Sequence, residues 1–121
     1  QTLAYKTALW IKDNLPKDKI YSAANTGILS YFTQFRFVNL DGMVNNDELL
    51  NAYREGDKKY IDYLKKKNIN YLVDYFLSEK PENKYYFPEI LNDKYEIVKV
   101  FTDKRLKYQK LNHMIVIRLK L

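Results

Sequence analysis

The order of apolar and polar positions divides the chain into short helical and extended segments. Apolar residues recur at helical spacing from Leu3 to Leu15, where Pro16 stops the pattern. A short helical pattern covers Ile28 to Phe32, and a longer one runs from Asn45 to the lysine run Lys65-Lys66-Lys67. The longer pattern is interrupted at Gly56-Asp57, where Asp57 can cap a second piece, and a last short helix is expected over residues 87–91.

Five segments have the pattern of strands, and two of them carry extra information. The apolar character of Ile69 to Phe76 is nearly continuous, which is typical of a strand covered on both faces. The segment from Leu111 to Leu121 alternates, which predicts an antiparallel strand with one wetter face. The predicted strands are Lys19–Ala24, Arg36–Leu40, Ile69–Phe76, Tyr95–Thr102 and Leu111–Leu121.

The alternation of helices and strands predicts the fold class. We expect one α/β domain over residues 1–121, a three-layer Rossmann-like arrangement with a mainly parallel sheet. Right-handed crossovers would make the first three strands parallel neighbours. The last two strands are expected to form a C-terminal antiparallel hairpin at one edge.

The amino-acid composition excludes several kinds of functional site. The 121 residues include no cysteine and one histidine, which excludes disulfides, thiolate chemistry and any two-histidine metal site within the chain. No apolar run approaches the roughly 18 residues of a membrane span. The chain begins with Gln1, so we expect a fragment or processed product of something longer.

The net charge of +6 raises the question of a negatively charged partner. The lysines are spread along the chain, and the single run, Lys65-Lys66-Lys67, is expected to complement a helix end. The few arginines, the residues best suited to base and phosphate contacts, weaken a nucleic-acid role. They are Arg36, Arg54, Arg105 and Arg118. A stand-alone basic module that binds a polyanion, either anionic lipid or nucleic acid, remains an alternative.

Polar residues follow the first three predicted strands, where ligands bind in open α/β sheets. Asp74 lies near the end of the third strand. The residues near the ends of the first two strands form the candidate substrate-binding set. That set is Asn25, Thr26, Asn39, Asp41 and Gly42. The same residue types are also what turns and helix caps require. The lone Gly27 makes no phosphate-binding fingerprint, so no cofactor is expected.

Other chemistry has weaker support. Asp41, Asp47 and Glu48 lie close in sequence, but capping explains such carboxylates as well as acid–base work does. His113, on the apolar face of the last strand, is expected at the edge of the core with one nitrogen hydrogen-bonded. The aromatic run Tyr85-Tyr86-Phe87 could stack on bases or sugars or meet lipid, although core packing is the plainer explanation. A small soluble enzyme with a site at the strand ends is a third alternative.

Several segments together resemble a known family. Their order along the chain is Trp10 to Pro16, Asn25-Thr26-Gly27, Phe37 to Asn45, and Tyr63 to Val73. This succession resembles the soluble C-terminal domain of polytopic membrane glycosyltransferases of the GT-C type, including mannosyltransferase-like and uncharacterised bacterial members. The resemblance covers roughly the first 100 residues, and Asn39-Leu40-Asp41-Gly42-Met43-Val44-Asn45 is its most distinctive part.

The resemblance implies a place and a role for the chain. It would be an extracytoplasmic domain of a cell-membrane enzyme that transfers a sugar from a polyprenyl-phosphate donor. Its partners would be the membrane-embedded part of the same chain, the bilayer surface and the donor or acceptor, with no nucleic acid. In that family the catalytic acidic residues lie in an early loop between membrane spans. No segment here matches that loop, so no catalytic or metal-binding residue is carried over, and the domain is expected to be inactive alone.

Overall fold

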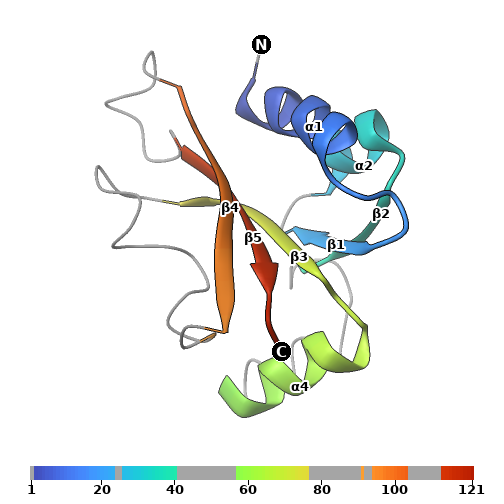
Figure 1. The fold of residues 1–121 in the computed structure, drawn as a ribbon, viewed down its shortest axis with the longest axis vertical. Helices are drawn as coiled ribbons and strands as arrows, with labels where there is room; N and C mark the ends of the chain where they lie inside the picture. Colours follow the sequence, from blue (N-terminus) through green and yellow to red (C-terminus); the bar gives the residue numbers. More distant parts are fainter. Residues whose placement is uncertain (1, 24–25, 41–56, 77–90, 92–93, 104–112) are drawn as a thin grey trace.

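The computed structural model describes residues 2–23, 26–40, 57–76, 91, 94–103 and 113–121 (Figure 1). The described helices are α1 (Leu3–Asn14), α2 (Gly27–Thr33) and α4 (Asp57–Lys66). The strands are β1 (Ile20–Ala23), β2 (Arg36–Asn39), β3 (Tyr71–Phe76), β4 (Tyr95–Thr102) and β5 (His113–Leu119). The helical pattern after Asn45 and the helix expected over 87–91 lie outside these residues, apart from α4 and Leu91.

Helix α1 begins and ends where its sequence specifies. The hydroxyl of Thr2 accepts a hydrogen bond from the Tyr5 amide at 3.2 Å, which satisfies one of the free amide groups of the first turn. At the other end the Leu15 amide donates to the Ile11 carbonyl at 2.9 Å. Pro16 follows immediately, as the sequence predicted.

The five strands form one mixed sheet in the order β2-β1-β3-β5-β4. The first three strands are parallel neighbours, as predicted, and β4 pairs antiparallel with β5. The expectation of a mainly parallel, three-layer Rossmann-like domain is nevertheless wrong. Strand β5 returns antiparallel beside β3, so the antiparallel pairings join the three longest strands, of 6, 8 and 7 residues. Among the described helices, only α4 lies away from the α1–α2 face, at one end of the sheet (Figure 1).

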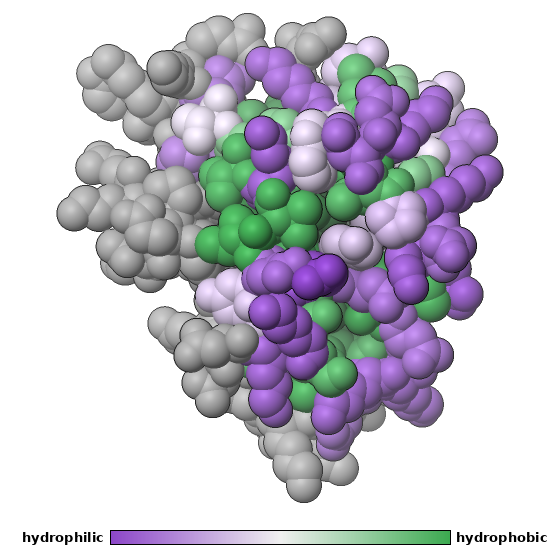
Figure 2. Space-filling view, in the orientation of Figure 1, coloured by the Kyte–Doolittle hydropathy of each residue, from purple (hydrophilic) through white to green (hydrophobic). Residues whose placement is uncertain are grey.

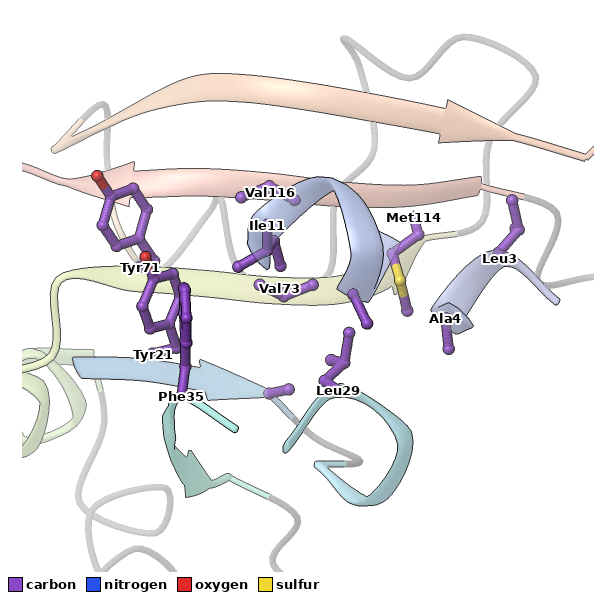
Figure 3. Close-up of a cluster of buried hydrophobic side chains, with 12 residues drawn as sticks. Leu3, Ala4, Ile11, Tyr21, Leu29, Phe35, Tyr71, Val73, Met114 and Val116 are labelled. Carbon is purple, nitrogen blue, oxygen red and sulfur yellow. The ribbon is translucent and has the colours of Figure 1, made fainter. Parts of the chain in front are cut away.

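Helices α1 and α2 lie side by side on one face of the sheet and cover the first of two buried clusters (Figures 1 and 3). In this α1–α2 cluster the ring of Tyr21 stacks on Tyr71 with 4.8 Å between centroids, and Phe35 lies 5.4 Å away on a tilt. Figure 3 shows these rings at one end of the cluster. The buried members are Leu3, Ala4, Ala8, Ile11, Tyr21, Ala23, Leu29, Phe35, Tyr71, Val73, Met114 and Val116.

The opposite face carries a second buried cluster, to which α4 contributes Tyr63 and Leu64. The buried members of this α4 cluster are Leu40, Tyr63, Leu64, Ile69, Leu72, Leu91, Ile115 and Ile117. Successive residues of β3 and β5 therefore enter alternate clusters, as the two-residue period of a strand requires. Coverage of β3 on both faces confirms the prediction from its continuous apolar run. The wetter face predicted for the last strand is wrong, because all five residues from His113 to Ile117 are buried.

Asn70 ties three strands together at the start of β3. Its side-chain oxygen accepts from the Ile20 amide at 2.9 Å, and its own amide donates to the Ile20 carbonyl at 2.8 Å. Its carbonyl accepts from the Leu119 amide, also at 2.8 Å. One asparagine thus links the beginnings of β1 and β3 to the end of β5.

Replacing Asn70 with alanine is expected to lower the free energy of unfolding by about 1–2 kcal/mol. The Ile20 amide would lose its side-chain acceptor in a partly buried position. Asn14→Ala is a matched control, since the Asn14 side chain makes an exposed, local bond to the Trp10 carbonyl. It should cost less than about 0.5 kcal/mol. Urea unfolding of both variants measures the difference, and equal losses would contradict the role given to Asn70.

The buried hydroxyl of Tyr21 makes the free energy of unfolding depend on pH in the alkaline range. It donates to the Pro16 carbonyl at 2.6 Å, and burial, with Tyr71 and Asp18 nearby, raises the pKa of Tyr21 above its ordinary value of 10.0. As the pH rises, the unfolded chain loses this proton before the folded protein does. The contribution of the protonated hydroxyl to stability is therefore fully present below pH about 10 and falls as the pH rises further. Urea unfolding between pH 8 and 11.5 should show that the free energy of unfolding declines less steeply with pH for Tyr21→Phe than for the wild type. Parallel curves would contradict this assignment.

Candidate functional site

The candidate residues gather where the parallel strands end. Asn39 closes β2 directly beside Ala23, the last residue of β1, and the Leu40 amide donates to the Ala23 carbonyl at 2.8 Å. Ala23 in turn pairs with Val73 of β3. Asn39 is half-buried and occupies the last paired position of β2, on the side of the sheet that α1 and α2 cover. The first three strands therefore bring their carboxyl ends to one edge, as the topology predicted.

Thr26 lies at this same edge, because it opens helix α2 three residues after β1 ends. Its carbonyl accepts from the Ser30 amide at 2.7 Å, and its hydroxyl makes no capping hydrogen bond. The structure thus brings Thr26 and Asn39 to the same end of the β1–β2 pair. Three of the predicted residues, Asn25, Asp41 and Gly42, lie outside the described residues, as do Asp47, Glu48 and the run Tyr85-Tyr86-Phe87.

Asp74 does not join Asn39 on one face. It follows Val73 on β3, and Val73 enters the α1–α2 cluster, so the next side chain is on the opposite side of the sheet. Asp74 therefore shares its face with Leu72 and its cross-strand partner Ile115. That the strand ends are adjacent does not by itself place two polar side chains on the same face of the sheet. The parity of each residue along its strand decides which polar groups can meet.

A second polar group lies where β4 ends and β5 begins. The Thr102 hydroxyl and the Nδ1 atom of His113 are 2.9 Å apart, and the histidine is 6% exposed. Asp103 next to them is buried. The position of His113 at the edge of the core, with one nitrogen engaged, agrees with the prediction. Asp103 was missed, because a polar residue at a strand end gives no sequence signal of burial.

The buried serine of β1 has a structural role. The hydroxyl of Ser22 donates to the Tyr71 carbonyl at 2.9 Å, which joins β1 to β3 beyond their ladder. A nucleophilic serine would instead need an exposed hydroxyl beside a base. Over the ranges that the structure describes, no three His, Asp or Glu residues group in a way that could hold a metal ion. No helix in these ranges is long and apolar enough to cross a bilayer.

The positively charged side chains of the lysine run have different structural roles. Lys65 and Lys66 stand in the last turn of α4, where they complement the helix dipole. Lys67 lies over the Tyr63 ring at 5.7 Å. Figure 2 shows hydrophilic side chains spread around an apolar area near the middle of one face. The expectation that the lysine run complements a helix end is confirmed.

Part of the charge on β4 and β5 is balanced by a carboxylate. Glu96 accepts from Arg118 at 2.5 Å, and Lys120 lies 3.7 Å from its other oxygen. All three side chains are substantially exposed, so this network contributes little to stability. It does lower the charge available to a polyanion on this part of the surface.

Comparison with solved structures finds the same fold in a protein of distant sequence. The chain is similar to the C-terminal globular domain of the oligosaccharyltransferase AfAglB-S2 from Archaeoglobus fulgidus, with a TM-score of 0.56 and 15% sequence identity. The alignment covers 99% of each chain, so the likeness extends over the whole of that domain. At this identity the likeness establishes the fold.

Comparison by sequence gives a family. No curated protein matches the chain. A family described as "Domain of unknown function (DUF8728)" matches residues 1–115, which is nearly the whole length. The chain therefore belongs to the DUF8728 family.

Proposed function

We propose that this chain is an accessory domain of a membrane glycosyltransferase. The domain would be held on the extracytoplasmic side by the membrane-embedded part of the same chain, which carries the catalytic residues. In this role it would bind or position a substrate, and it would be inactive in isolation.

The observation that carries the proposal is the fold shared with a domain of an oligosaccharyltransferase across 99% of both chains. A second line of support comes from the sequence, in which Phe37 to Asn45 resembles the soluble domain of GT-C glycosyltransferases. The likeness in fold does not rest on close sequence similarity, because the two sequences are only 15% identical. Both support an accessory domain of a membrane glycosyltransferase.

The edge formed by Thr26 and Asn39 is the part of the domain proposed to meet substrate. Amide and hydroxyl groups there can hydrogen-bond to sugar hydroxyls or to a phosphate. Asp41 and Gly42, which follow Asn39 after Leu40 in the sequence, complete the proposed set together with Asn25. The donor would be a polyprenyl-phosphate sugar, whose lipid tail requires a site close to the bilayer.

A stand-alone module that binds a polyanion through charge alone has less support. Strong binding of that kind needs many cations on one surface, each releasing counterions from the polyanion. Lys65 and Lys66 complement a helix end, Lys67 lies over a ring, and Lys120 lies beside Glu96. Three of these cations stand at the end of α4 and the fourth follows β5, and they serve different local roles.

Substitution at the strand edge tests the substrate-binding role. In the full-length enzyme, Asn39→Ala and Asp41→Ala are each expected to lower sugar transfer about tenfold, as loss of one hydrogen bond to a charged or hydroxylated substrate would. Transfer of radiolabelled sugar in isolated membranes measures the effect. Immunoblots for protein level and circular dichroism of the 121-residue domain show whether folding is retained.

Asn14→Ala is the control for this experiment, because Asn14 is exposed at the end of α1 and its side chain donates to the Trp10 carbonyl within the same helix. It should leave transfer unchanged. Unchanged transfer in both edge variants would remove this edge from the substrate site. A gene whose product lacks several runs of about 20 apolar residues would contradict the assignment to a membrane enzyme.

A further inference from the structure

Helices α1 and α2 expose a continuous group of large apolar side chains. Tyr31 is 75% exposed, Ile28 41% and Phe32 36%. These three residues occupy positions i, i+3 and i+4, which form one stripe along a helix. Exposure of a single apolar residue needs no explanation, but three on one stripe of a seven-residue helix form a patch.

The patch continues from α2 onto α1 through ring contacts. The ring of Phe32 meets Tyr5 of α1 edge to face at 4.7 Å between centroids, and it meets Tyr31 at 5.0 Å in the same manner. Leu9 follows Tyr5 by four residues and is also exposed, so it extends the stripe along α1. We call the five side chains the aromatic patch: Tyr5, Leu9, Ile28, Tyr31 and Phe32.

Exposed cations border the aromatic patch. Lys12 lies seven residues after Tyr5, close to two turns along the same side of α1, and Lys6 is adjacent to Tyr5. Both lysines are exposed. Asp13 is also exposed, next to Lys12 and four residues after Leu9, and it is the one acidic residue of α1 and α2. Lys6 and Lys12 against Asp13 leave the charged residues around the patch with one excess positive charge. The surroundings therefore favour a partner that is apolar where the rings reach and negatively charged around them.

We propose that the aromatic patch binds the surface of an anionic lipid bilayer. Aromatic side chains with a polar end favour the boundary between headgroups and acyl chains, and Tyr31 and Tyr5 present this combination. Lysine stems can lie along apolar surface while the ammonium groups reach anionic headgroups, which suits Lys6 and Lys12. The net charge of +6 adds attraction to such a surface at longer range.

The arrangement also fits the rest of the fold. The inner sides of α1 and α2 are fixed to the sheet by the α1–α2 cluster, so the patch is presented on a rigid pair of helices. The inference refines the proposed function by naming the surface that faces the bilayer. It does not depend on the strand edge, because Thr26 and Asn39 are not members of the patch.

Co-sedimentation of the 121-residue chain with lipid vesicles tests the proposal. We expect binding to vesicles of phosphatidylglycerol and phosphatidylcholine that weakens with salt. The double variant Tyr31→Ser/Phe32→Ser should weaken binding about tenfold, because it removes apolar area that enters the interface. Lys12→Glu should weaken binding about fivefold or more on anionic vesicles and much less on pure phosphatidylcholine.

Two matched controls separate the patch from general apolarity and general charge. Ile97→Ser removes a side chain that is 44% exposed on β4, opposite Ile117, and so on the face away from α1 and α2. Lys94→Glu makes the same charge change as Lys12→Glu just before β4. Both controls should bind nearly as the wild type does, and circular dichroism should show every variant folded.

Three results would overturn the proposal. They are absence of vesicle binding by the wild type, equal losses in patch and control variants, and unchanged binding by Tyr31→Ser/Phe32→Ser. Sugar transfer in the full-length enzyme is measured separately. If the patch variant binds vesicles normally but impairs transfer in detergent, the patch packs against protein instead of lipid. If the chain does not bind vesicles but sugar transfer still depends on Asn39, the lipid-binding proposal fails and the proposed accessory function stands.

Discussion

The fold depends on the burial of strands β3 and β5 from both sides. Side chains of β3 alternate between two separate clusters, with Val73 entering one and Leu72 the other, and β5 does the same with Val116 and Ile117. Neither cluster could form without the antiparallel pairing of these strands, which places the four side chains in register. Removal of this much apolar surface from water supplies the main free energy of folding. The remaining elements add to this central pair.

The central pair also decides where functional groups can lie. Parallel strands β1 and β2 extend one side of the sheet and place Asn39 beside the end of β1. Antiparallel strand β4 extends the other side and brings Thr102 to His113. Among the described residues, one polar region thus lies at the parallel strand ends and another where β4 ends and β5 begins. Only the first corresponds to the predicted substrate-binding residues, and the second serves the edge of the core.

The outer surfaces of α1 and α2 have a composition that core packing does not require. Their inner positions are filled by small or aliphatic residues such as Ala8 and Leu29, which allow close approach to the sheet. Their outer positions carry the half-buried Tyr5 and the exposed Tyr31 and Phe32, and the Phe32 ring contacts the other two. An accessory domain of a membrane enzyme would have a use for such a surface, because it must keep a fixed orientation close to a bilayer.

The sequence alone determined most elements and some of their relations. Local signals were sufficient for helix α1 and for the parallel order of the first three strands, because capping, proline and crossover handedness act over short distances. Only the tertiary structure decided that β5 inserts beside β3. Alternation along His113 to Ile117 predicted one wetter face, but apolar layers from distant segments cover both. Strand partners and face coverage depend on contacts between residues far apart in sequence, and local patterns do not record those contacts.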